Sequence, residues 1–247
     1  MQLSSAQRSC VARGQASRRP RAVSVAAAKT RSKVGFRYDP ANLRWVRDDR
    51  LADLSVDDSK TVIQPKTGAA YQAWPVVHTV LNDAGLKTVS CEEAAKLSKQ
   101  GWTLIDVRLA GDFEKWHAEG AVNVPLYRYV EGQGPWDNLK RLAMFAFAMK
   151  ATERNPDFIS ELNKTVKKNS KILVMCAIGG TLDTLVSYRR EKKLYNDPER
   201  QFGRESRSLK AVYEMLESGW SVNNIRHVDG GFQQWRFQGL PTNDDEE

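Results

Sequence analysis

The chain has 247 residues, three cysteines and a formal charge of +8. A sparse and odd cysteine count argues against a disulfide framework and predicts a reducing compartment, and no apolar run approaches the roughly 18 residues that span a bilayer. Residues 1–37 hold nine of the positive charges and no Asp or Glu, so subtracting these nine from +8 leaves −1 for the remainder. The composition therefore excludes a basic nucleic-acid binder, because the excess charge belongs to the amino end.

Residues 1–33 are predicted to be a transit peptide. They are rich in Arg, Ser and Ala and free of acidic residues, which is typical of such segments, and the small residues at 23–28 offer a processing site. The alternative is a basic tail that stays attached to the protein.

Residues 34–87 are predicted to form an N-terminal arm, in which residues 74–81 make a short helix. Pro75 suits the first turn of that helix and Gly85 suits its end. The arm could wrap the main domain or dock a partner, and wrapping is the simpler interpretation.

From Thr88 onward, segments typical of strands and helices alternate. Ser90 and Glu93 form a capping box for a helix over residues 92–100, and the apolar residues 102–107 predict a strand covered on both faces. Strands alternating with helices indicate an α/β fold with a mostly parallel sheet. The further predicted elements are a short helix at 111–117, a strand at 121–125, helices at 139–150 and from Asn155, a strand at 171–175, a helix from Ser206 to Gly219, a strand at 224–228 and a terminal helix from 231.

The helix at 139–150 is unusually apolar and is predicted to belong to the core. Its apolar residues are spread around the helix, so contact with a membrane surface stays open as an alternative.

Cys176 is the strongest candidate for chemistry. It follows the apolar run at 171–175, so it is expected at the carboxyl end of a buried strand, where open α/β sheets bind ligands. Gly179 and Gly180 let a backbone approach closely. A helix that begins near Ser206, with arginines beside it, would stabilise a thiolate. The alternative is that Cys176 is a small buried hydrophobic residue.

Two sequence patterns carry a resemblance to a known family. Residues 104–108, with Asp112, His117 and the run 120–125, resemble the first signature of rhodanese-like domains, and residues 230–235 with 239–241 resemble the second. The resemblance covers residues 88–242, which leaves an acidic tail at 243–247. It implies a rhodanese-like α/β fold with a central, mostly parallel five-stranded sheet and helices on both faces.

The resemblance also implies sulfurtransferase chemistry without a cofactor. The Cys176 thiolate would take a sulfane sulfur from a small anionic donor such as thiosulfate, become a persulfide, and pass the sulfur to cyanide, a thiol or a protein acceptor. Arg207 or Arg204 would orient the donor. The other implied site residues are Gly179, Gly180, Ser206 and Ser208 in the sulfur cradle, with Asp106 and Arg108 as supports.

The cysteine loop departs from the family pattern, which usually reads C-x-x-G-x-R. Thr181 stands where the arginine is expected, and residues 203–208 look like the displaced end of the loop. Such long inserted loops resemble a plastid branch of rhodanese-like proteins, which favours the chloroplast (stroma or thylakoid-associated) over the mitochondrion as the destination. The intervening insertion is basic and could be a solvated loop or a lid; it contains Tyr188, Arg189, Arg190, Lys192, Lys193 and Arg200.

The departure motivates a second hypothesis, a non-catalytic rhodanese-like binding module. A phosphatase of the C-x5-R type is disfavoured, because Leu182 stands where its arginine is required. The sulfurtransferase hypothesis requires Cys176 and Arg207 to meet in space although the insertion separates them.

Three further residue types have simpler interpretations. Cys91 is expected to be inert, although a helix amino end could lower its pKa. Arg108 and Asp112, four residues apart, could form a structural ion pair. The three histidines lack metal-ligand spacing, so no metal site is predicted.

Overall fold

The computed structural model describes residues 35–48, 50, 61–187, 194–196 and 198–244. The predicted transit peptide lies outside these residues, as do most of the basic positions of the insertion and the end of the acidic tail. The described residues all belong to one compact unit.

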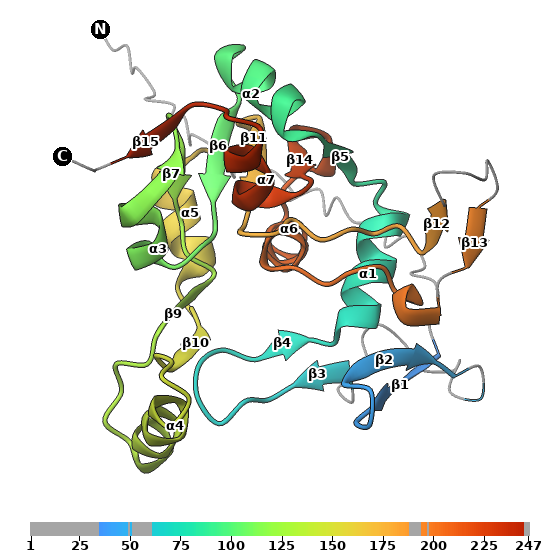
Figure 1. Ribbon diagram of the computed structural model, residues 1–247, viewed down its shortest axis with the longest axis vertical. Coiled ribbons are helices and arrows are strands. Elements are labelled where there is room, and N and C mark those ends of the chain that lie inside the picture. Colours follow the sequence, from blue (N-terminus) through green and yellow to red (C-terminus); the bar gives the residue numbers. More distant parts are fainter. Residues whose placement is uncertain (1–34, 49, 51–60, 188–193, 197, 245–247) are drawn as a thin grey trace, which may run out of the picture. The chain divides into compact units, whose positions relative to one another are not determined.

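A five-stranded parallel sheet forms the centre of the fold, with the strand order β5–β14–β11–β6–β8 (Figure 1). Every neighbouring pair is parallel, so the predicted α/β architecture is confirmed. The middle strand, β11, is buried along its whole length. The strand bounds are β5 Lys87–Val89, β6 Thr103–Asp106, β8 Val122–Asn123, β11 Ile172–Met175 and β14 Ile225–Val228.

Helices cover both faces of this sheet. Successive residues of a buried strand point to opposite sides, so each face has its own core. Ile172 and Val174 of β11 belong to a core that also contains α1 (Trp74–Asp83), α5 (Phe158–Thr165) and α6 (Arg207–Glu217). Leu173 and Met175 belong to a second core with α2 (Cys91–Lys99) and α7 (Gly231–Phe237). A short 3₁₀ helix, η4 (Val222–Asn224), leads from α6 into β14.

The N-terminal arm packs onto the domain. Seven of the ten residues of α1 are buried, and they share a core with α6; this confirms the wrapping interpretation. Before α1 lie β1 (Phe36–Asp39) and β2 (Arg44–Arg47), which pair antiparallel, and β3 (Val62–Ile63) and β4 (Tyr71–Gln72), which also pair antiparallel.

The arm also holds the two ends of the insertion. Trp74 Nε1 donates to the carbonyl of Phe202 at 2.8 Å, and His78 Nε2 lies 2.8 Å from the carbonyl of Leu182. The insertion itself contains the antiparallel strands β12 (Leu185–Ser187) and β13 (Leu194–Asn196) and the 3₁₀ helix η3 (Pro198–Arg200).

The segment predicted as a helix at 111–117 is shorter than expected. Helix α3 covers Ala110–Lys115, and β7 (Trp116–Ala118) follows at once because it pairs antiparallel with β15 (Thr242–Asp244). The carboxyl-terminal strand thus closes against the first half of the domain.

The prediction that residues 139–150 form a core helix is wrong. Helix α4 spans Pro135–Phe145 and has no buried residue. It lies at the end of a two-stranded ribbon formed by β9 (Tyr127–Tyr129) and β10 (Thr152–Arg154), away from the central sheet (Figure 1). The physical reason is that the polar side of α4, not its apolar side, faces the protein.

Candidate active site

Cys176 directly follows β11, at the carboxyl end of the central strand. The residue is 2% exposed and its thiol is free. Because β6 and β14 run parallel to β11 on either side, their carboxyl ends meet at the same edge as Cys176. Cys176 therefore lies at the strand end where the sequence predicts it.

The insertion leaves and re-enters the cysteine loop at one place. The Thr181 N–H donates to the Arg204 carbonyl at 3.0 Å, and the Arg204 N–H donates back to the Thr181 carbonyl at 2.7 Å. This bridge joins the two halves of the loop, so residues 204–208 continue the turn around Cys176 that residues 177–181 begin.

Two glycines make this close packing achievable. Gly179 and Gly180 have φ angles of +76° and +82°, a region that side chains disfavour. A Cβ on Gly179 would lie 2.5 Å from the nitrogen of Gly230, and one on Gly180 would lie 2.6 Å from the carbonyl oxygen of Arg204. Both positions therefore require glycine, for space as well as for conformation.

Ser208 is the side chain that contacts the thiol. Its Oγ lies 3.2 Å from Cys176 Sγ, 3.1 Å from the Gly179 carbonyl oxygen and 3.1 Å from Ser206 Oγ. Ser206 caps α6 by accepting from the Leu209 N–H at 3.2 Å. The Ser208 hydroxyl has only one proton to donate in a hydrogen bond. A thiolate at Cys176 can accept that hydrogen bond.

His227 lies beside Ser208 and the Gly179 carbonyl, although the sequence offers no catalytic pattern for it. Its Nε2 lies 2.8 Å from the Gly179 carbonyl and 3.1 Å from Ser208 Oγ. Burial lowers the pKa of His227 to about 4, so the ring is neutral at pH 7. Since a carbonyl can only accept, Nε2 carries the proton and donates it there, which leaves the Ser208 proton available to Cys176.

The expected pairing of the two strands could have revealed His227. In the register of β14 on β11, His227 stands opposite Val174, which lies two residues before Cys176. A polar residue at a buried strand position beside a candidate nucleophile is informative, because buried polar groups need partners.

The backbone after Cys176 presents free donors. The N–H groups of Phe232 and Gln233, at the start of α7, donate to the carbonyls of Cys176 and Ala177 at 2.8 and 2.9 Å. In a trans peptide the C=O and the next N–H point in opposite directions, so the N–H groups of Ala177 and Ile178 point away from α7. Within the described residues these two N–H groups have no acceptor, and they can bind an anion.

The two candidate arginines lie near the re-entry point of the insertion. Arg207 is the first residue of α6, and its guanidinium lies over the ring of Tyr127 at 5.1 Å. It makes no hydrogen bond to any residue that the structure describes. The side chain of Arg204 is exposed. Tyr127 was not anticipated from the sequence, because it belongs to a short strand with no catalytic pattern.

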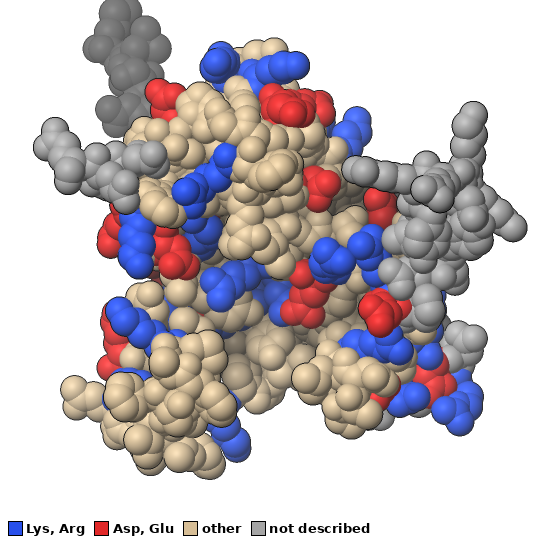
Figure 2. Space-filling view, in the orientation of Figure 1, with Lys and Arg blue, Asp and Glu red and all other residues tan. Residues whose placement is uncertain are grey.

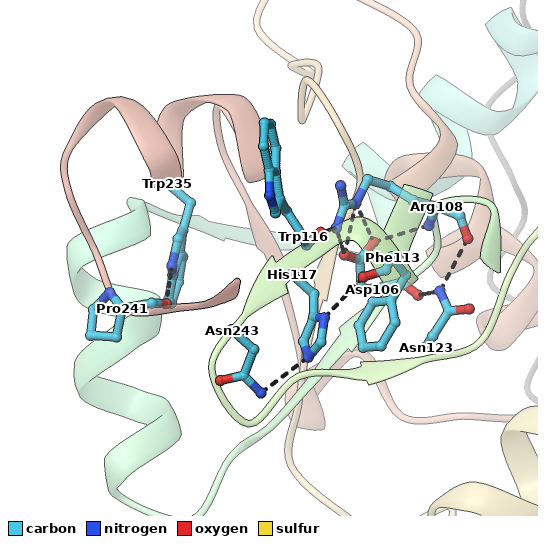
Figure 3. A network of polar contacts seen from close by, with 9 residues as sticks. All are labelled: Asp106, Arg108, Phe113, Trp116, His117, Asn123, Trp235, Pro241 and Asn243. Atoms are coloured by element: carbon cyan, nitrogen blue, oxygen red, sulfur yellow. Dashed lines mark hydrogen bonds and ion pairs between the residues drawn. The ribbon is translucent and has the colours of Figure 1, made fainter. Parts of the chain in front are cut away.

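Asp106 and Arg108 support the loop from the neighbouring strand end (Figure 3). Arg108 Nη2 pairs with Asp106 Oδ2 at 2.7 Å. The prediction that Arg108 pairs with Asp112 is therefore wrong. The Arg108 guanidinium also lies 3.9 Å from the ring centroid of Phe232. Arg108 therefore reaches the cysteine loop through Phe232, whose N–H donates to the Cys176 carbonyl.

The remaining signature residues join the two ends of the domain (Figure 3). His117 Nδ1 donates to the Phe113 carbonyl at 2.9 Å and its Nε2 accepts from Asn243 at 3.2 Å. Trp235 Nε1 donates to the Pro241 carbonyl at 2.9 Å. These residues hold the two ends of the domain together and have no printed contact with Cys176.

Cys91 is buried away from the Cys176 loop's polar contacts and has its own hydrogen-bond acceptor. It is 1% exposed, and its Sγ donates to the Asp229 carbonyl at 3.2 Å. Burial, with the nearby charge of Asp229, raises the pKa of the Cys91 thiol to about 11. Burial therefore outweighs the helix amino end in setting this pKa, which agrees with the expected inertness.

No group of three or more His, Cys, Asp or Glu in the described part of the chain could hold a metal ion. Among the same residues, no helix is long and apolar enough to cross a membrane.

Comparisons with known proteins bear on this site. Residues 90–238 match the family model described as rhodanese-like domain. The chain is 32% identical over 189 residues to rhodanese-like domain-containing protein 14, chloroplastic, from Arabidopsis thaliana. These 189 residues cover 76% of this chain and 78% of the relative. It is 26% identical to thiosulfate sulfurtransferase 16, chloroplastic, from the same organism, over 63% of this chain and 91% of the relative.

Proposed function

We infer that this chain, which belongs to the rhodanese-like domain family, is a sulfurtransferase that uses Cys176 as its nucleophile. The observation that carries the proposal is the rejoined loop: the Thr181–Arg204 bridge returns Ser208 to within 3.2 Å of the Cys176 thiol despite the insertion. Relatives named thiosulfate sulfurtransferase support the same reaction class.

The first half-reaction transfers one sulfur atom. The Cys176 thiolate attacks the sulfane sulfur of thiosulfate, an S–S bond forms to Sγ, and the bond from sulfane sulfur to sulfonate breaks. Sulfite leaves with the electron pair, and a Cys176 persulfide anion remains. In the second half-reaction, cyanide or an acceptor thiolate takes the terminal sulfur and returns the Cys176 thiolate.

The described contacts suit both anionic states of the cysteine. The Ser208 hydroxyl donates toward the thiolate, and the free N–H groups of Ala177 and Ile178 are available for the terminal sulfur of the persulfide. The amino end of α6 adds a favourable electrostatic field for negative charge. His227 keeps this arrangement in place through the Gly179 carbonyl.

We assign donor orientation to Arg207. Its guanidinium packs on Tyr127 and has no hydrogen-bond partner among the described residues, so its donors are available to a sulfonate group. Arg204 is a second cation at the entry to the site. This arrangement replaces the arginine that the family pattern expects at position 181.

The second candidate function is a non-catalytic binding module. The observation in its favour is the 2% exposure of Cys176, because a donor must reach the sulfur. Under this hypothesis the cradle would be a structural remnant, and the protein would give no sulfur transfer even with an intact thiol.

We propose a plastid location. The relatives named above are chloroplastic by name, and the acid-free amino end has the composition of a transit peptide.

The test is thiocyanate formation from thiosulfate and cyanide. The unaltered protein should form thiocyanate, and Cys176→Ser should abolish it. Arg207→Gln should raise KM for thiosulfate, whereas the matched control Arg226→Gln should not, because Arg226 stacks on Trp102 at the opposite end of the sheet. If the folded protein forms neither thiocyanate with cyanide nor a persulfide on any acceptor thiol, the binding-module hypothesis replaces this one.

A further inference from the structure

Helix α4 and the turn after it expose an apolar surface that has no partner in the described structure. None of the residues of α4 is buried, and monomeric proteins seldom expose large apolar side chains together in this way. We call this surface the α4 patch; its members, with their exposed fractions, are Trp136 (52%), Leu139 (53%), Leu142 (68%), Phe145 (78%), Phe147 (73%) and Met149 (53%).

The orientation of α4 is held by its polar side. Lys140 Nζ donates to Thr67 Oγ1 at 2.7 Å, and Arg141 Nη1 donates to the carbonyls of Val130 and Gly132 at 3.1 and 2.6 Å. Asp137 accepts from the Gly134 N–H at 3.0 Å and fixes the start of the helix. The helix is thus anchored with its polar side inward, which turns its apolar side outward.

Two lysines lie at the edge of the α4 patch. Lys66 Nζ lies 5.3 Å from the ring centroid of Trp136, and Lys150 Nζ lies 5.1 Å from that of Tyr129. Figure 2 shows this region at the lower left as an almost uninterrupted uncharged surface, with several basic and some acidic side chains at its edges. Figure 1 places α4 at the outer end of the β9–β10 ribbon, so the patch can meet an extended surface without obstruction from the sheet.

We propose that the α4 patch binds the surface of an anionic lipid bilayer, with α4 lying in the interfacial plane. Exposed Trp, Phe and Leu beside Lys are the composition of interfacial helices, and anionic headgroups attract the lysines. A second copy fits less well, because a twofold interface would pair the patch with itself and gather the lysines of both copies around one interface.

The binding should be reversible and sensitive to salt. One short helix and the turn after it, with six apolar side chains together, insert only to the level of the headgroups. The attraction of Lys66 and Lys150 to anionic lipid is screened at high ionic strength. Binding should therefore require anionic lipid and fall as salt is raised.

The experiment is co-sedimentation of the full chain with phosphatidylglycerol-containing vesicles and with pure phosphatidylcholine vesicles. The double variant Phe145→Asp, Phe147→Asp should bind the anionic vesicles at least about tenfold more weakly than the unaltered chain. The matched control is Phe237→Asp, which alters an 85% exposed phenylalanine on α7 and should leave binding unchanged. Every variant retains the basic amino end, so its attraction to lipid is common to all.

Three outcomes would overturn the proposal. Equal binding of the double variant and Phe237→Asp would show that another segment, such as the basic amino end, carries the attraction. Equal binding to both vesicle types would remove the role of the lysines. A lipid-free dimer in sedimentation velocity that the double variant abolishes would assign the α4 patch to a second copy. Because α4 buries no side chain, thermal unfolding of the double variant should match that of the unaltered chain.

Discussion

Replacement of His227 offers a quantitative test of how the cysteine loop is held. The ring is fully buried, and burial lowers its pKa from 6.5 to about 4. The unfolded chain therefore binds a proton at His227 below about pH 6.5, whereas the folded chain does so only near pH 4. Because the unfolded state binds more protons in this window, the free energy of unfolding falls as the pH drops through it.

The size of the effect follows from the two pKa values. At about 1.4 kcal/mol per pH unit, the whole gap corresponds to about 3 kcal/mol of stability, and about 2 kcal/mol of it should be lost between pH 7 and pH 5. His227→Gln can still donate toward the Gly179 carbonyl but cannot titrate, so this part of the pH dependence should disappear.

The assay is urea unfolding of both proteins at pH 7 and pH 5. His78, whose pKa burial also lowers, contributes to both proteins, so the difference between them isolates His227. If the unaltered protein and His227→Gln lost the same free energy of unfolding between the two pH values, His227 would not be the buried neutral group described here.

Three further predictions concern the loop and its supports. Gly180→Ala should lower the free energy of unfolding by about 3 kcal/mol, because the φ is strained and the Arg204 carbonyl is close. The control Gly101→Ala, at a φ of +91° with open space, should lower it by only about 1 kcal/mol. Equal losses would show that close packing plays no role. Arg108→Met should cost about 3 kcal/mol by leaving Asp106 buried and unpaired, and adding Asp106→Asn should recover part of it in urea unfolding; no recovery would argue against the pair. Cys91, with a pKa of about 11, should resist iodoacetamide at pH 8 in the folded protein and react in urea, as mass spectrometry can show, and rapid native labelling would refute its inertness.

Much of the fold could be predicted because its pattern is local. The N-cap Ser90, which accepts from the Glu93 N–H, and the apolar run before Cys176 are set by neighbouring residues, and the helix and the strand appear where expected. The position of Cys176 at a strand end followed from the apolar run just before it, which needs no long-range information.

The sequence raises the question whether the cysteine loop closes again after the insertion, but it cannot answer that question. Closure depends on the backbone bridge between Thr181 and Arg204, and backbone pairing carries no side-chain pattern. It also depends on the N-terminal arm, since Trp74 and His78 hold carbonyls at the two ends of the insertion. Contacts over more than a hundred positions leave no local trace.

The misplaced helix shows a different limit. An apolar helix is usually buried, and residues 139–150 were interpreted that way. The hydrogen bonds of Lys140 and Arg141 to Thr67, Val130 and Gly132 instead hold its polar side inward. Periodicity identifies an apolar side but not the direction it faces.

The central claim is that Cys176 becomes a persulfide within the rejoined loop. The most direct measurement is mass spectrometry of the Cys176 peptide after the folded protein is incubated with thiosulfate. The account predicts a gain of one sulfur atom on Cys176 that cyanide removes as thiocyanate, with Cys91 unmodified. An unmodified Cys176 in folded protein, under conditions where a thiosulfate sulfurtransferase control is fully charged, would contradict the account.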